Sequence, residues 1–227
     1  MRVVAITVWF NEDPDHLAKL ALSLAGFADG LVAVDGAYRY FPNGAARSRP
    51  EEAIALIEGC DHSGVELVLH QPNRLWEGEV AKRNTALRLA RSLNPDWVVI
   101  VDGDTEIGYH EGVRDALAKT KFDVALTRMV DDESVANRQW CNIRNVFRYS
   151  DDLEWWRTHY MVRKGEKLLF CPLPANERLA LQLPPLASAC SLRYLTMIHH
   201  PKRGYRRSQA LKSYEERDRI GIETPAG

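Results

Sequence analysis

Apolar runs and helical periodicities alternate along the first hundred residues of the chain. The apolar runs lie at 2–10, 31–34, 65–69 and 97–101. They are short and rich in β-branched residues, which is typical of buried parallel strands. Between them, apolar side chains recur at helical spacing in segments that begin at Pro14, Pro50 and Glu77. This alternation predicts an α/β fold with helices on both faces of a mostly parallel sheet.

The second half of the chain has a different pattern, with shorter strands and fewer helical segments. Further strands are predicted at 122–127, 143–149 and 192–199, a hairpin at 161–170, a proline-rich loop at 172–185 and a charged helix at 208–220. No linker composition separates the two halves. We therefore expect one domain, 1–227, whose halves share a sheet.

Composition narrows the class of protein. The chain has 227 residues, 45% hydrophobic and 27% charged, which is ordinary for a globular protein. The net charge of -1 argues against a dedicated nucleic-acid binder. The first apolar run stops at Phe10, far short of the roughly 20 residues that span a bilayer, and no signal-peptide pattern follows, so we expect a cytoplasmic protein. The four cysteines are scattered, which indicates neither a zinc site nor a disulfide framework.

Polar segments follow each predicted strand of the first half. They are Phe10-Asn11-Glu12, Asp35-Gly36-Ala37, 70–84 and Asp102-Gly103-Asp104. In open α/β sheets, ligands bind beyond the carboxyl ends of the strands, and these four segments share that edge. Asp102 and Asp104 could together hold a divalent cation such as Mg²⁺ or Mn²⁺ with its phosphate ligands. The alternative is an Asp-Gly turn that merely ends the strand.

Lys82, Arg83 and Asn84 fall in the first turns of the helix predicted over 77–93. The helix macrodipole disfavours cations at this end unless an anion lies nearby. A bound nucleotide diphosphate would supply that anion. The alternative is that both cations pair with Glu77 and Glu79 on a solvated face.

Four motifs, in order, resemble those of a family-2-like glycosyltransferase of the GT-A fold. They are Trp9-Phe10-Asn11-Glu12, Val34-Asp35-Gly36, the segment from Lys82 to Leu87, and Trp97 through Asp104. A looser resemblance links Arg144–Arg148, Trp155, Trp156 and His159 to a later segment of that family, although Tyr160 replaces its Glu. The resemblance implies a GT-A type open mixed sheet, with a nucleotide-sugar-binding half at 1–107 and an acceptor side with a C-terminal lid at 108–227.

The resemblance also implies roles for individual residues in binding a UDP- or GDP-type sugar donor. Phe10, Asn11, Glu12 and Asp35 would frame the base and ribose, and Lys82, Arg83 and Asn84 would reach the nucleotide. Asp102, Gly103 and Asp104 would hold ribose, metal and diphosphate, with Asp102 and Asp104 as ligands of Mn²⁺ or Mg²⁺. A late histidine, His199 or its neighbour His200, would complete the metal shell, and we take His199. Arg206 would close over the diphosphate.

The catalytic base and the acceptor are less well specified. Carboxylate or histidine candidates for the base are Asp131, Asp132, Glu133, Asp151, Asp152, Glu154 and His159, of which we take Asp132 and His159. Trp155 and Trp156 could form a stacking platform for an acceptor. The acceptor could be a glycan, a protein, a small molecule or a nucleic acid. Inversion at the sugar is favoured only through the family resemblance.

Two other functions fit part of the sequence. An apolar strand followed by Asp102-Gly103-Asp104-Thr105 is also the signature of haloacid-dehalogenase-like phosphatases, in which Asp102 would be the nucleophile. That signature normally opens its domain, whereas here about a hundred residues precede it. A non-catalytic module that binds nucleotide sugars is the other alternative.

Overall fold

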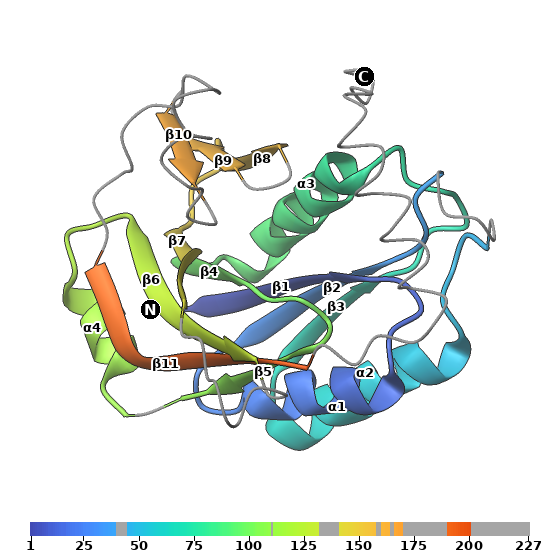
Figure 1. Ribbon diagram of the computed structural model, residues 1–227, viewed down its shortest axis with the longest axis horizontal. Helices are drawn as coiled ribbons and strands as arrows, with labels where there is room; N and C mark the ends of the chain where they lie inside the picture. Colours follow the sequence, from blue (N-terminus) through green and yellow to red (C-terminus); the bar gives the residue numbers. More distant parts are fainter. Residues whose placement is uncertain are drawn as a thin grey trace.

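The computed structural model describes residues 1–39, 45–109, 111–131, 141–157, 160–163, 166–169 and 190–200. Within these residues, the main sheet has eight strands in the order β3-β2-β1-β4-β7-β6-β11-β5, and three further strands form a small sheet in the order β10-β9-β8 (Figure 1). The expectation of an α/β fold with an open, mixed sheet and helices on both faces is confirmed.

The first four strands form the parallel half of the sheet. They are β1 (Val3–Trp9), β2 (Gly30–Asp35), β3 (Glu66–His70) and β4 (Trp97–Ile100). The helices between them are α1 (Pro14–Ser23), α2 (Pro50–Ser63) and α3 (Glu79–Ala90), and the short helix η1 (Arg91–Leu93) follows α3. Each of these strands and helices was predicted, with bounds that differ by a few residues.

The remaining strands extend the sheet in mixed directions. They are β5 (Thr105–Gly108), β6 (Val124–Asp131), β7 (Cys141–Arg148) and β11 (Cys190–His199), with α4 (Val113–Lys119) between β5 and β6. β7 pairs antiparallel with β4 and so joins the two halves in one sheet. β11 runs parallel to β6 and antiparallel to β5. The predicted segments 172–185 and 208–220 lie outside the described residues.

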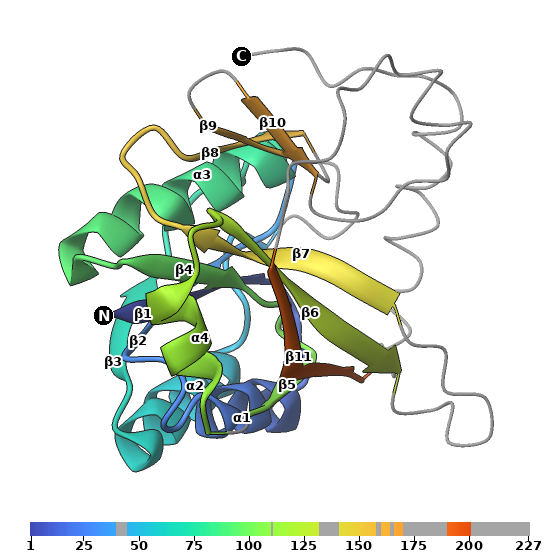
Figure 2. The ribbon, with the colours of Figure 1, turned by 90° about the vertical axis from the view of Figure 1, so that its left-hand side faces the viewer.

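The small sheet consists of β8 (Glu154–Arg157), β9 (Tyr160–Arg163) and β10 (Glu166–Leu169). β9 and β10 pair antiparallel, as the predicted hairpin requires. Figures 1 and 2 both place this small sheet beside α3. Trp155 of β8 is buried in the same apolar cluster as the inner face of α3.

Alternation along β1 divides the core into two layers. Val3 and Ala5 face α1 and α2, whereas Val4 and Ile6 face α3 on the opposite side of the sheet (Figure 1). Burial of β1 on both faces explains its unbroken apolar run. The carboxyl ends of the strands consequently open toward the start of α3 on one side and the start of α1 on the other.

No helix in the described part of the chain is both long and apolar enough to cross a membrane.

Candidate active site

The polar segments that follow β1, β2 and β4 meet at one edge of the sheet. Trp9 pairs in register with Asp35, and β4 continues alongside β1 through the bond from Val101 N to Ile6 O (3.0 Å). Direct contacts, described below, link all four motifs of the sequence at this edge. Their predicted meeting at the carboxyl edge is therefore observed.

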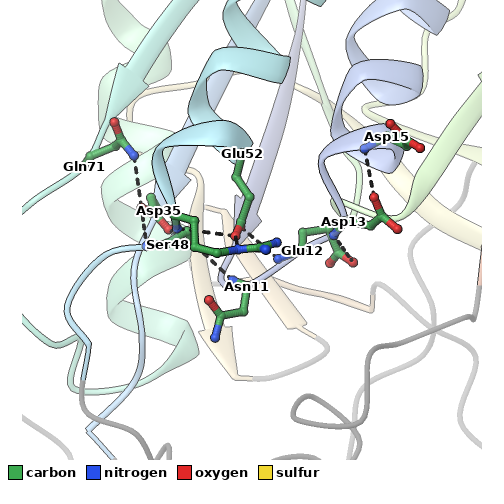
Figure 3. Close-up of polar contacts among 9 residues, drawn as sticks. Asn11, Glu12, Asp13, Asp15, Asp35, Ser48, Glu52 and Gln71 are labelled. Atoms are coloured by element: carbon green, nitrogen blue, oxygen red, sulfur yellow. Dashed lines mark hydrogen bonds and ion pairs between the residues drawn. The ribbon is translucent and has the colours of Figure 1, made fainter.

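Asp35, the last residue of β2, is fully buried, and its carboxylate is held by two polar neighbours (Figure 3). Ser48 donates to it twice, from its backbone N to Oδ2 (2.9 Å) and from Oγ to Oδ1 (2.6 Å). Gln71 donates a third bond from Nε2 to Oδ2 (3.1 Å). Three donors fix the plane of the carboxylate. Ser48 was not predicted to belong to the site, and Gln71 was predicted only as part of the polar segment 70–84 at this edge.

Gly36, which follows β2, occupies a position that only glycine fits. Its φ is +120°, in the range that side chains rarely adopt. A Cβ here would lie 2.8 Å from both Ala46 O and Trp76 Nε1. Trp76 needs that space because its indole N–H donates to the backbone oxygen of Asp35 (2.8 Å). The glycine turn therefore sets the direction in which the chain leaves Asp35.

The loop after β1 is tied to the start of α2. Asn11, at a φ of +52°, donates from its backbone N to Ser48 Oγ (3.0 Å), and Glu12 N donates to Glu52 Oε2 (2.9 Å), as Figure 3 shows. Burial raises the pKa of the Glu52 carboxyl, although hydrogen bonds from Ser48 and Arg49 oppose the shift. Glu12 is itself buried, and Phe10 is half-buried. Glu52 was not predicted, because it lies in an ordinary helix start.

Lys82 of α3 is 1% exposed and lies beneath this edge. Its ammonium donates to Trp9 O (2.5 Å) and to Gly36 O (2.7 Å), so it joins the ends of β1 and β2. Burial lowers the pKa of Lys82 to about 7, and the nearby Asp35 carboxylate opposes the shift. The contact with a nucleotide that the resemblance implies stays a prediction, and the structure shows Lys82 bonded to the backbone instead.

Arg83, the next residue of α3, faces the loop after β4. It donates to Glu79 Oε1 (2.7 Å) and to Asp102 Oδ1 (3.1 Å), and its guanidinium lies 4.6 Å from the centroid of the Trp155 ring. Burial alone would lower the pKa of Arg83, but the carboxylates of Glu79 and Asp102 outweigh it and raise the pKa. Its Nη1 atom has no hydrogen-bond partner within the described residues. One guanidinium thus connects the small sheet to the loop after β4.

Asn84 contacts the small sheet instead of the edge. Its Nδ2 donates to Trp155 O (2.8 Å), and Trp155 N donates to its Oδ1 (2.5 Å). The amide therefore pairs with the backbone of β8 much as a neighbouring strand would. Its predicted contact with a nucleotide remains untested.

Asp102, Gly103 and Asp104 form the turn after β4. The Asp102 side chain is 39% exposed, whereas Asp104 is fully buried and its backbone O accepts a bond from His200 N (2.8 Å). A Cβ on Gly103 would lie 3.2 Å from Leu17 Cδ2 and 3.4 Å from Glu12 Cγ, so this turn packs against the loop after β1. Within the described residues, no three His, Cys, Asp or Glu side chains are grouped so that they could hold a metal ion by themselves.

A pair of histidines borders this turn, of which His200 was a candidate from the sequence and His16 was not. The rings of His16, from α1, and His200 stack with their centroids 5.3 Å apart. His200 Nε2 lies 3.3 Å from Glu106 Oε2, and His16 Nδ1 lies 3.9 Å from Glu12 Oε1. The sequence indicated a late histidine, but it gave no signal for His16 or Glu106.

Several predicted site residues cannot be placed. Asp132, His159 and Arg206 lie outside the described residues, as does the side chain of His199, whose backbone pairs with Thr105. Among the other base candidates, Asp151 pairs with Arg91 (3.1 Å), just past the C-terminal end of α3 and away from Lys82 and Arg83. That position does not favour Asp151 as the base.

Among solved structures, several chains of S. aureus TarS are similar to this chain. The chain is similar to S. aureus TarS, with a TM-score of 0.44 and 22% sequence identity over 59% of this chain and 22% of that one. It is also similar to TarS 1-349 in complex with UDP-GlcNAc (TM-score 0.44, 22% identity, 59% and 36% of the two chains) and with UDP (0.43, 22%, 59% and 37%). The matched part thus spans little more than a third of even the shorter TarS chain.

A scan against models of protein families found no match, and neither did a search of curated proteins. A likeness as distant as that to TarS decides neither function nor substrate.

Proposed function

We propose that this protein is a glycosyltransferase that transfers a sugar from a nucleoside-diphosphate donor of the UDP or GDP type. The observation that carries the proposal is the convergence, at one sheet edge, of the buried Asp35 carboxylate, the Asn11–Glu12 loop and the Asp102–Asp104 turn. Ligands of open α/β sheets bind at this edge.

The two ends of the edge suit different parts of such a donor. Asp35 presents a carboxylate, an acceptor for N–H or O–H groups of a base or ribose. Arg83 places a fixed positive charge beside Asp102, and its Nη1 has no partner within the described residues. Guanidinium groups bind phosphate oxygens well, so the diphosphate would lie between Arg83 and the turn after β4.

The residues of the turn fit the divalent cation that we propose. Mg²⁺ and Mn²⁺ usually bind through one or two carboxylates together with substrate phosphates, and Asp102 and Asp104 supply two carboxylates one residue apart. His199 would add a third ligand. When bound, such a cation would stabilise the negative charge that develops on the leaving diphosphate. Burial of Asp104 and packing of Gly103 against Leu17 keep the turn in one conformation.

The described residues do not favour the phosphatase alternative. Asp102 follows the fourth strand of the sheet, and the loops after β1 and β2 contribute polar groups to the same edge. A phosphatase that uses Asp102 as its nucleophile has no need of Asp35 or of the bonds that hold it.

Calorimetric titration with UDP-sugars and GDP-sugars, with and without Mn²⁺, tests the proposal, and release of the nucleoside diphosphate measures turnover. We expect one class of nucleotide sugar to bind and Mn²⁺ to strengthen its binding. Asp104→Asn should abolish the effect of Mn²⁺, whereas Asp35→Asn should weaken binding with and without the metal. Asp61→Asn, an exposed change near the end of α2, is the matched control. Failure of every nucleotide sugar to bind the wild-type protein would refute the proposal, and binding without turnover would favour the non-catalytic module.

A further inference from the structure

Lys82 carries a charged group to a place where the structure provides mainly backbone partners. Its side chain is 1% exposed, and its ammonium donates to the oxygens of Trp9 and Gly36. Within the described residues, the structure records no ion pair for this ammonium. Burying a charged group costs free energy unless polar partners compensate for the lost water, and these two carbonyl oxygens are the partners of the Lys82 ammonium.

The two carbonyls belong to the two loops that form the base and ribose end of the site. Trp9 is the last residue of β1 and precedes the Phe10–Glu12 loop. Gly36 follows Asp35 directly, at a φ of +120°, and leaves no room for a Cβ between its backbone and Ala46 and Trp76. One nitrogen atom on α3 therefore sets the spacing between the loop after β1 and the carboxylate after β2.

We infer that Lys82 is a positioning residue for the nucleoside part of the donor, which it serves through Trp9 and Gly36 and not through contact with the diphosphate. The inference rests on the proposed function and changes the role that the family resemblance implies for this residue. Arg83, one position later, faces Asp102 and is the cation suited to the diphosphate.

The protonation of Lys82 separates the two roles. Burial lowers the pKa of Lys82 to about 7 against the opposing charge of Asp35, with smaller effects from Arg83 and Glu79 on its own helix. The ring of Tyr38 also lies near, with its centroid 5.3 Å from Nζ. A neutral amine retains two hydrogens, enough for both carbonyls. Lys82 can therefore still hold the two carbonyls in place after it loses its proton, whereas its electrostatic attraction to a phosphate would be lost.

The test compares a nucleoside with its nucleotide sugar, using the base that the titrations identify. Lys82→Met removes both hydrogen bonds. It should lower the affinity for the nucleoside (uridine or guanosine) and for its nucleotide sugar (UDP-sugar or GDP-sugar) by the same factor of about ten. Lys82→Gln, which keeps two amide hydrogens on a shorter side chain, should recover part of the loss for both ligands. Lys19→Met, at an exposed position of α1, should change neither. Affinities are measured by ligand-observed NMR, with the folded fraction checked by circular dichroism.

A loss confined to the nucleotide sugar in Lys82→Met would overturn the inference and leave the proposed function intact. Wild-type protein provides a second measurement that does not depend on folding of a variant. From pH 7 to about 8.5, the ratio of the two affinities should stay constant, because the diphosphate of a nucleotide sugar does not titrate there. If the affinity for the nucleotide sugar, divided by that for the nucleoside, fell about tenfold as Lys82 loses its charge, the ammonium would be attracting the diphosphate. If wild-type protein binds neither ligand, the proposed function fails, and the inference fails with it.

Discussion

The depressed pKa of Lys82 makes the stability of the folded protein depend on pH in a predictable direction. The usual value is 10.5, and burial lowers it to about 7. Between these values the unfolded chain binds a proton at Lys82 that the folded chain has released. The free energy of unfolding therefore rises with pH across this window, and the gain is lost as the pH falls toward 7.

The magnitude follows from the two pKa values. Each pH unit within the window is worth at most about 1.4 kcal/mol, and less near pH 7, where the folded protein is itself half protonated. From pH 7 to about 8.5, Lys82 should contribute an increase of about 1.5 kcal/mol. The measurement must stop there, because burial raises the pKa of the Cys60 thiol from 9.0 to about 12, which destabilises the folded state at higher pH.

Urea unfolding at several pH values, followed by circular dichroism, measures this increase. Lys82→Met should remove it, because Met has no proton to exchange, whereas exposed Lys19→Met should retain it. Histidines contribute to the pH dependence of both variants alike, so the difference between the two variants isolates Lys82. An equal slope in Lys82→Met and Lys19→Met would show that Lys82 is not a titrating buried amine, and the reasoning would be wrong.

Three further variants test other contacts of the site. Gly36→Ala should destabilise the fold by about 2 kcal/mol or more, measured as a lower thermal midpoint, because the new Cβ would lie 2.8 Å from a backbone oxygen; an unchanged midpoint would contradict this. Asn84→Ala should cost about 1–3 kcal/mol through the two lost bonds to Trp155, and Asn84→Asp, which puts a carboxylate oxygen against Trp155 O in place of the donor, should cost at least as much in urea unfolding. Ser48→Ala should weaken nucleotide-sugar binding about tenfold by removing the one hydrogen bond to Oδ1 among the three that hold the Asp35 carboxylate; unchanged affinity in calorimetry would show that this bond does not matter.

The parallel half of the fold could be predicted because its signals are local. β1, β2 and β4 are buried on both faces, so each appears in the sequence as an unbroken apolar run. β5 was missed for the opposite reason. Only four residues long, it exists through pairing with β11, about ninety residues later, and alternates between buried and half-buried positions. Strands formed by such distant pairing carry little propensity of their own.

The site shows the same division between local and distant information. Asp35 and Asp102 could be placed at one edge because each directly follows a predicted strand. Ser48 could not, because it lies in a connecting segment, 13 residues from the Asp35 that it contacts. Gln71 falls in the segment 70–84 that the sequence places at this edge, but its bond to Asp35, 36 residues away, could not be predicted. Glu52 belongs to the start of α2, and nothing in that ordinary helix start points to its contact with Glu12 N. Contacts of this kind become visible only when the chain is folded.

Lys82, Arg83 and Asn84 illustrate why a motif does not by itself assign roles to its members. Successive residues of an α-helix point about 100° apart, so three neighbours cannot all face one ligand. Lys82 points toward the ends of β1 and β2, Arg83 toward Asp102, and Asn84 toward the backbone of β8. Three successive residues near the second turn of α3 thereby fix the relative positions of the ends of β1 and β2, the turn after β4, and β8. A substitution at any one of the three residues should consequently alter a different contact, and the comparison of nucleoside with nucleotide sugar is the measurement that tells these effects apart.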